Sequence, residues 1–313
     1  MKALRHITRL LCALPLLAAL AVQAQDEGSN FASSAGPQAL TGTLAQARAS
    51  GAIALAYRDS SVPFSYLDAR GQPIGYSIEL CKSLVRAVEA AVQRPLTIRW
   101  VPVTSATRMQ AITSGQADLE CGSTTSNLER QKSVAFSPTI FVAGTRLLVR
   151  KGAGIRDWRD LAHKKVVVTA GTTNVQVMRH LSERLKLPIS LVQAPDHAQA
   201  FAQVEGGSAD AFATDDVLLY GLVAQTPGAG KRLAVVGELL SYEPYAIMFR
   251  KGDPQLAKLV TDSMRALAQD GEIDRQYRRW FLQKLPGTQQ RLGLPMSAQL
   301  EAIIQSLAAA QVE

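Results

Sequence analysis

Hydrophobic and polar positions follow two alternating patterns from about residue 40 to the end of the chain. Short apolar or β-branched runs, such as 53–57 and 165–169, fit strands because turn residues bound them and they are too short for buried helices. Longer stretches with apolar residues three and four positions apart, such as 78–92, fit helices with one buried face. This alternation predicts an α/β fold in which helices cover parallel sheets.

The same two patterns predict the remaining strands and helices. Further strands are predicted at 96–101, 117–121, 189–193 and 209–213. Further helices are predicted at 106–112, 174–184, 198–204, 217–224, 253–268, 271–282 and 296–310. One more helix is expected to begin at Ser126-Asn127-Leu128-Glu129, which has the form of a capping box.

The elements fall into two series, and each series resembles a complete α/β lobe. Two similar extended apolar runs, 140–151 and 242–251, bracket the second series. These runs predict two strands that cross between the lobes, so that one lobe is inserted into the other. The predicted boundaries are 40–142 and 244–313 for a discontinuous lobe 1, and 143–243 for an inserted lobe 2.

The N-terminus has the pattern of a secretory signal peptide. Three basic residues precede the apolar run 10–22, and Val22-Gln23-Ala24 offers small residues for cleavage. The run is shorter than the ~20 residues that span a bilayer, so a membrane anchor is the weaker alternative. We therefore predict a signal peptide at 1–24, a polar, flexible leader at 25–39, and a soluble mature protein in the periplasm.

Net charge bears on the kind of ligand that the chain can bind, and the cysteines raise the question of a disulfide. The predicted signal peptide carries three of the 34 basic residues and none of the 26 acidic ones, so the mature chain has a net charge of +5. A small, scattered excess attracts anionic ligands but does not form the basic stripe of a nucleic-acid-binding protein. Cys81 and Cys121 both lie in apolar patterns. Although the periplasm permits a disulfide, we expect two buried free thiols.

The sequence offers little for catalysis or for cofactor binding. The mature chain has three histidines, and it contains no Gly-x-Ser-x-Gly motif, no glycine-rich phosphate loop and no metal-binding pair of histidines. We expect no metal and no cofactor. Arginine, serine and threonine instead follow several predicted strands, where α/β sheets bind their ligands. Arginine at such positions suits carboxylates, because its planar guanidinium donates two parallel hydrogen bonds.

Six stretches carry a resemblance to a known family. They are YRDSSVPFSY (57–66), VTSATRM (103–109), DLECGSTTSNLERQKSVAFS (118–137), TAGTT (169–173), DHAQAF (196–201) and ATDD (213–216). The chain resembles the glutamate/aspartate-binding proteins, which belong to the polar amino-acid branch of the solute-binding proteins of ABC transporters. The resemblance covers nearly the whole mature chain. It implies the type II fold, with two α/β lobes that are joined by two strands and close on the ligand.

By this resemblance, Arg130 pairs with the α-carboxylate of the ligand, and Ser123 and Thr125 hold the ligand through backbone N–H groups and hydroxyls. Thr173 closes over the α-carboxylate from lobe 2, and its neighbour Thr172 is an alternative. The family usually has serine where Ala170 stands in this sequence. The competing structural explanations are a surface arginine paired with an adjacent glutamate, and hydroxyls that only cap helices.

A second group of residues resembles the site for the side-chain carboxylate. Arg58 and Arg108, with Ser105, would bind that carboxylate, unless Asp59 or Glu120 pairs with one of the arginines. His197 resembles a ligand-contacting histidine, and a carboxylate beside it would favour its protonated form.

One acidic residue completes the implied site. Asp215 resembles the acid that pairs with the α-ammonium group, and Asp216 is its rival. Such a charge pattern fits glutamate or aspartate and fits basic or apolar amino acids poorly. The two acids differ by one methylene, which the sequence does not resolve.

The resemblance implies a monomeric protein that captures an acidic amino acid and delivers it to an ABC permease in the inner membrane. It implies no enzymatic step, no cofactor and no nucleic acid. Two alternatives use the same fold: a small dehydratase acting on a carboxylate, with Glu120 or Asp215 as the acid, and a sensor module.

Overall fold

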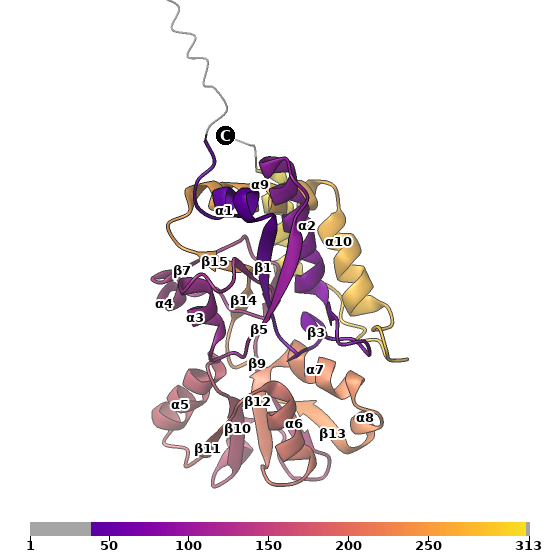
Figure 1. The fold of residues 1–313 in the computed structure, drawn as a ribbon. Helices are drawn as coiled ribbons and strands as arrows, with labels where there is room; N and C mark the ends of the chain where they lie inside the picture. The colour runs from indigo at the N-terminus through magenta and orange to yellow at the C-terminus, as the bar shows by residue number, and fades with distance from the viewer. Residues whose placement is uncertain (1–38, 311–313) are drawn as a thin grey trace, which may run out of the picture. The chain divides into compact units, whose positions relative to one another are not determined.

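The computed structural model describes residues 39–310 (Figure 1). The predicted signal peptide and all but the last residue of the predicted leader lie outside this range. Within this range, the residues from 40 onward form one compact unit. Within the described range, no helix combines the length and the apolar character needed to cross a membrane.

The first sheet has five strands in the order β5-β1-β6-β15-β7. Their bounds are Thr97–Pro102 (β5), Ala52–Tyr57 (β1), Leu119–Glu120 (β6), Met248–Arg250 (β15) and Val134–Phe136 (β7). β1 pairs in parallel with β5 and β6, whereas β15 runs antiparallel to β6 and β7. The sheet is therefore mixed, because β15 returns late in the chain through a crossing segment and not through a helix.

Helices cover the first sheet and build most of the core. They are α1 (Gly42–Ser50), α2 (Tyr76–Val92), α3 (Arg108–Thr113), α4 (Leu128–Gln131), α9 (Pro254–Gln269), α10 (Glu272–Tyr277), η2 (Arg278–Leu282) and α11 (Ala298–Ala309). Alternate residues of β1 enter different cores: Ile53 and Leu55 pack with α2, and Ala54 and Ala56 pack with α3. A strand buried on both faces in this way explains the continuous apolar run in the sequence.

A small three-stranded sheet lies beside the first sheet. Its strands are β2 (Ser60–Ser61), β3 (Ser65–Leu67) and β4 (Pro73–Ile74). The Ser65 hydroxyl accepts from the Arg58 backbone N–H at 2.8 Å and donates to the Arg58 carbonyl at 3.0 Å. These bonds hold the backbone of Arg58 in place at the end of β1.

The second sheet repeats the plan in the order β11-β10-β12-β9-β13. The bounds are Ser190–Ala194 (β11), Lys165–Thr169 (β10), Ala211–Asp215 (β12), Thr145–Arg150 (β9) and Leu233–Val236 (β13). The covering helices are η1 (Trp158–Leu161), α5 (Asn174–Leu185), α6 (His197–Glu205), α7 (Asp216–Gln225) and α8 (Ala229–Arg232). β10, β11 and β12 are parallel, and β9 is antiparallel to β12 and β13. Each sheet with its helices forms one lobe of a two-lobe α/β fold.

Two short strands pair outside both main sheets, as the extended runs predicted. β8 (Phe141–Ala143) and β14 (Glu243–Tyr245) are antiparallel. β8 leads into β9 of the second sheet, and β14 is followed by β15 of the first. A Cβ atom on Gly144 would lie 2.4 Å from the Ser241 carbonyl oxygen, so only glycine allows the two segments to approach this closely.

The capping-box prediction is wrong by one residue. Asn127, and not Ser126, is the N-cap of α4: its backbone is extended and its side chain accepts from the Arg130 N–H at 2.9 Å. The Ser126 N–H instead donates to the Pro244 carbonyl of β14. Pairing with the crossing strand therefore draws Ser126 away from the helix end.

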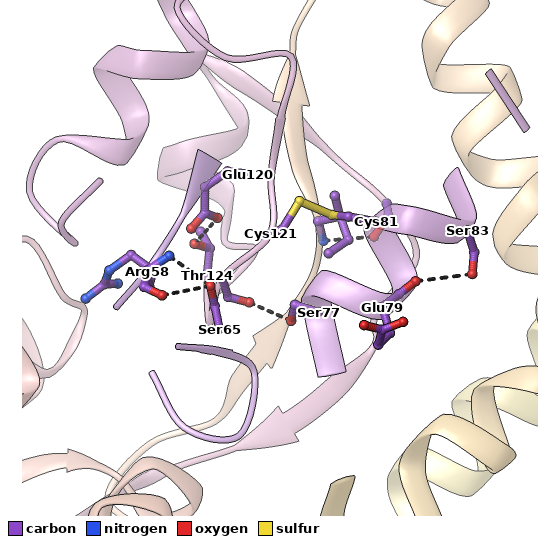
Figure 2. The surroundings of a disulfide bond; sticks show 12 residues. Arg58, Ser65, Ser77, Glu79, Cys81, Ser83, Glu120, Cys121 and Thr124 are labelled. Atoms are coloured by element: carbon purple, nitrogen blue, oxygen red, sulfur yellow. Dashed lines mark hydrogen bonds between the residues drawn. A yellow bond between two sulfur atoms is a disulfide. The ribbon is translucent and has the colours of Figure 1, made fainter. Parts of the chain in front are cut away.

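Cys81 and Cys121 form a disulfide, and our expectation of two free thiols is wrong (Figure 2). Cys81 lies in α2, and Cys121 immediately follows β6; both are fully buried. Their Cα atoms are 6.1 Å apart, within the range that a disulfide bridges. The packing of α2 on the first sheet thus brings together two thiols that each looked like an isolated core residue in the sequence.

Candidate functional site

Polar residues from both lobes line one small cavity at the carboxyl ends of the parallel strands. The lining residues are Ser105, Arg108, Ser123, Thr125, Thr172, Thr173, Asn174, His197, Asp215 and Leu218. Seven of the nine predicted site residues are among them; Arg58 and Arg130 are not. The cavity measures about 10 Å³, roughly one water molecule. An amino acid can enter only if the surrounding groups move apart.

Arg58 and Arg108 are buried, with exposed fractions of 1% and 2%. All three guanidinium nitrogens of Arg58 lack a hydrogen-bond partner among the described residues. Arg108 Nη1 donates to the Ser123 carbonyl at 3.2 Å and to Thr124 Oγ1 at 2.6 Å, whereas its Nε has no such partner. Buried charged donors without partners are costly. The pair is therefore poised to bind an anion.

Glu120 is an acidic neighbour of both arginines. It is fully buried; its Oε2 accepts from the Thr124 hydroxyl at 2.5 Å, and its Oε1 has no partner among the described residues (Figure 2). The described ion pairs join neither Asp59 nor Glu120 to Arg58 or Arg108. Burial, and then the charge of Arg108, lower the pKa of Arg58 to about 10. Arg58 therefore stays protonated at neutral pH and keeps its donors free.

The hydroxyls of Ser105 and Ser123 add two more unengaged groups. Both residues are buried, and neither Oγ atom has a hydrogen-bond partner among the described residues. Ser123 follows β6 and the disulfide, and Ser105 lies in the loop that leads into α3. A buried hydroxyl without a partner is destabilising, so both hydroxyls favour a polar ligand between them.

Arg130 reaches from the first lobe to the second. Its Nη1 donates to the Thr125 carbonyl at 2.8 Å, and its Nη2 donates to the Gly171 carbonyl at 3.3 Å. Burial, and then the charge of Arg108, lower its pKa to about 10, so it also remains charged at neutral pH. Arg130 thus lies at the junction of the lobes, next to the turn that leads to Thr173.

Gly171 brings the backbone of a second-lobe turn close to the backbone of the first lobe. Its φ is +76°, and a Cβ atom there would lie 2.6 Å from the backbone of Ala106 and 2.7 Å from that of Ser105. The second-lobe turn therefore rests directly on the loop that carries Ser105. A side chain at position 171 would separate these two segments.

His197 opens α6 and is buried beside the arginines. Its Nδ1 lies 2.8 Å from Thr169 Oγ1. Burial, and then the charges of Arg58 and Arg108, hold the pKa of His197 well below 6.5. The imidazole is therefore neutral at pH 7. The protonated form, which a carboxylate next to His197 would favour, is not the form that these surroundings stabilise.

Asp215 ends β12 and accepts two side-chain hydrogen bonds. Asn174 Nδ2 donates to Oδ1 at 2.7 Å, and the Tyr245 hydroxyl donates to Oδ2. Burial, and then the negative charge of Glu243, raise the pKa of Asp215 to about 7. A cation that entered the cavity beside Asp215 would favour the ionised carboxylate.

Three neighbours that competed for these roles have other contacts. Asp216 accepts from two backbone N–H groups, and it does not line the cavity. The Thr172 hydroxyl donates to the Thr169 carbonyl at 2.7 Å within its own turn. Glu129 pairs with Lys132 at 2.5 Å and not with the adjacent arginine.

Sequence reasoning missed three polar residues of this region. Asn174 and Tyr245 hold Asp215, and Glu243 accepts from the hydroxyls of Thr125 and Thr173. Glu243 is the one acidic residue in the extended run 242–251, and this was the available signal in the sequence.

Among the residues that the structure describes, no group of three or more His, Cys, Asp or Glu side chains is placed to hold a metal ion.

Comparison with known proteins identifies the family of this chain. Residues 53–283 match the bacterial extracellular solute-binding proteins, family 3. The chain is 42% identical over 269 residues to an L-glutamate/L-aspartate-binding protein of Pseudomonas aeruginosa, which covers 85% of this chain and 89% of that protein. It is 38% identical over 304 residues to a glutamate/aspartate import solute-binding protein of Salmonella typhimurium, with 97% of each chain covered.

A solved structure with the same fold holds an amino acid. An ancestral arginine-binding protein bound to arginine matches with a TM-score of 0.67 and 29% identity, over 74% of this chain and 98% of that one. The proteins that this chain resembles thus include ones named for acidic amino acids and ones named for a basic amino acid. The chain belongs to family 3 of the bacterial extracellular solute-binding proteins.

Proposed function

We propose that this protein captures L-glutamate or L-aspartate between its lobes and delivers it to the permease of an ABC importer. The observation that carries the proposal is the pair of buried arginines, Arg58 and Arg108, whose free donors need a carboxylate. The relatives from Pseudomonas and Salmonella, which are named for glutamate and aspartate binding, support the same choice.

Each charged group of the ligand has a proposed partner. Arg58, Arg108 and Ser105 bind the side-chain carboxylate, with His197 as a neutral neighbour. Arg130, the loop of Ser123 and Thr125, and the turn of Thr173 bind the amino-acid end, where Asp215 pairs with the ammonium. The proposal is supported by the seven of these nine residues that line one cavity. Because that cavity is so small, we propose that ligand entry and release require the lobes to separate.

The cellular setting is part of the same proposal. We propose a signal peptide at 1–24, a leader at 25–39, and a monomer that acts in the periplasm. Lobe 1 would comprise 40–142 and 244–313, and lobe 2 would comprise 143–243; the membership of the two main sheets supports this division. Binding would be reversible, without a chemical step and without a cofactor.

Titration calorimetry of the mature protein, refolded to remove any copurified amino acid, tests this function. L-Glutamate, L-aspartate, L-glutamine and L-arginine form the ligand panel. We expect tight binding of at least one acidic amino acid and much weaker binding of glutamine, which lacks the second carboxylate. Failure of both acidic amino acids to bind would contradict the proposal.

Substituting Gly171 by alanine is expected to weaken L-glutamate binding by about tenfold or more, because a Cβ atom would meet the backbone of Ala106 at 2.6 Å. The side chain would hold the lobes apart and oppose closure. Gly152→Ala is the matched control: its φ of +82° is similar, but no atom lies within 4 Å of the added carbon. Equal affinities for the two variants in the same calorimetric assay would contradict this role of Gly171.

A further inference from the structure

Glu243 joins the two lobes through one carboxylate oxygen. It lies on the crossing strand β14 with an exposed fraction of 3%. Its Oε2 accepts from Thr125 Oγ1 and from Thr173 Oγ1, each at 2.7 Å. Thr125 belongs to the first-lobe loop, and Thr173 immediately precedes α5 of the second lobe. Both threonines line the cavity, whereas Glu243 lies behind them.

The direction of these hydrogen bonds limits what the two hydroxyls can do. A hydroxyl carries one proton and two lone pairs, and an ionised carboxylate only accepts. Because each threonine hydroxyl uses its proton in a hydrogen bond to Glu243 Oε2, its oxygen can only accept from a further partner. Neither hydroxyl can then donate to a ligand carboxylate. Both are set to accept from an N–H group, such as an ammonium.

The remaining groups fit this division of roles. A carboxylate at the amino-acid end has other donors, namely Arg130 and the free N–H groups at the start of α5. An ammonium needs acceptors, and Asp215 provides one beside the threonines. Tyr245, two residues after Glu243 on the same strand, donates to Asp215. Residues two apart on a strand share a face, so β14 organises both acceptor groups together.

We infer that Glu243 is a positioning residue that fixes the Thr125 and Thr173 hydroxyls as acceptors and thereby selects ligands with an α-ammonium group over dicarboxylates that lack one. The inference rests on the proposed function, and it concerns one end of the same site. It also explains why an acidic residue is buried in the segment that crosses between the lobes.

The test compares L-glutamate with glutarate, which has the same two carboxylates and no ammonium. We expect the wild-type protein to prefer L-glutamate strongly. Glu243→Gln is nearly isosteric, but its amide can donate, so it can release or reverse the threonine hydroxyls. The ratio of the glutarate Kd to the L-glutamate Kd is expected to fall about tenfold or more, mainly through weaker L-glutamate binding. A purely structural defect would weaken both ligands alike.

A double-mutant cycle distinguishes two effects of Glu243: orientation of the threonine hydroxyls, and direct attraction of the ligand ammonium by the Glu243 charge. In a Thr125→Val/Thr173→Val background, Glu243→Gln is expected to cause little further loss of the ratio, because there are no hydroxyls left to orient. Additive losses would overturn the inference in favour of a direct charge effect. The Thr125→Ser variant keeps a hydroxyl and is expected to retain most of the wild-type ratio.

Thermal unfolding of each variant checks that it is folded. If Glu243→Gln does not fold, the Thr125→Val/Thr173→Val protein alone must lower the ratio, and an unchanged ratio there overturns the inference. A wild-type ratio retained in folded Glu243→Gln also overturns it, while wild-type glutamate binding leaves the proposed function intact. If the wild-type protein binds neither ligand, the proposed function and the inference both fail.

Discussion

Replacing Arg108 by alanine is expected to weaken L-glutamate binding by ~100-fold or more, the largest effect on affinity that we predict. Arg108 and Arg58 are both buried, and each keeps at least one guanidinium nitrogen without a partner among the described residues. Removing one partner of a buried charge pair costs ~3–5 kcal/mol, and ~1.4 kcal/mol corresponds to a tenfold change in Kd. Glutamine has no charge at this position, so its weaker binding is expected to suffer less.

Calorimetry with both ligands measures this effect. The expected signature of Arg108→Ala is a collapse of the preference for glutamate over glutamine. Arg150→Ala is the control: Arg150 is partly buried and, like Arg108, donates to backbone carbonyls, here those of Val204 and Ala209, but it does not line the cavity. The control is expected to keep the wild-type Kd. A folded Arg108→Ala protein that still binds glutamate within about threefold of wild type would contradict the side-chain site.

Loss of the disulfide is expected to produce the largest change in stability. The bridge closes a segment in which Cys81 and Cys121 are separated by 40 residues. By the chain-entropy model, a loop of this length lowers the free energy of the native state relative to the unfolded state by ~4 kcal/mol. The same link lies beside Gly122, whose carbonyl accepts from the Ser77 hydroxyl at 2.7 Å, so α2 is tied twice to the loop that carries Ser123 (Figure 2).

Denaturant unfolding of the wild-type protein, with and without a reducing agent, tests this prediction. Reduction keeps both sulfur atoms and breaks only the bond, so it isolates the effect of the cross-link. The Cys81→Ala/Cys121→Ala variant should lose at least as much stability, because it also leaves small cavities in the core. Thiol titration of the unfolded, unreduced protein should detect no reactive cysteine in the mature chain. Equal unfolding midpoints for oxidised and reduced protein would refute the role of the bond.

The elements that the sequence predicted well are those whose burial repeats locally. The strand Lys165–Thr169 has the predicted bounds, because its β-branched residues enter two cores in alternation: Val167 packs into one, and Val166 and Val168 into the other. The helix predicted at 78–92 spans Tyr76–Val92. Its end was predicted correctly and its start within two residues, because its buried residues recur at helical spacing. Period and burial act within a few residues, so a single chain carries enough information to predict such elements.

Contacts between residues far apart in the chain could not be predicted from local sequence patterns. Glu243 meets Thr125 and Thr173, which lie 118 and 70 positions away, and no local pattern links them. Cys81 and Cys121 each fit an apolar pattern as a free thiol, and only the packing of α2 on the first sheet pairs them. The predicted binding residues came from motif resemblance; the structure gathers seven of them around one cavity, and their roles stay predictions.

The most direct test of the two-carboxylate site is a crystal structure of the mature protein with L-glutamate. We predict that the side-chain carboxylate lies within about 4 Å of the guanidinium groups of Arg58 and Arg108, and the α-carboxylate at a similar distance from Arg130. The ammonium is predicted to contact Asp215. A complex in which the side-chain carboxylate points away from both Arg58 and Arg108 would contradict the account, whatever the measured affinity.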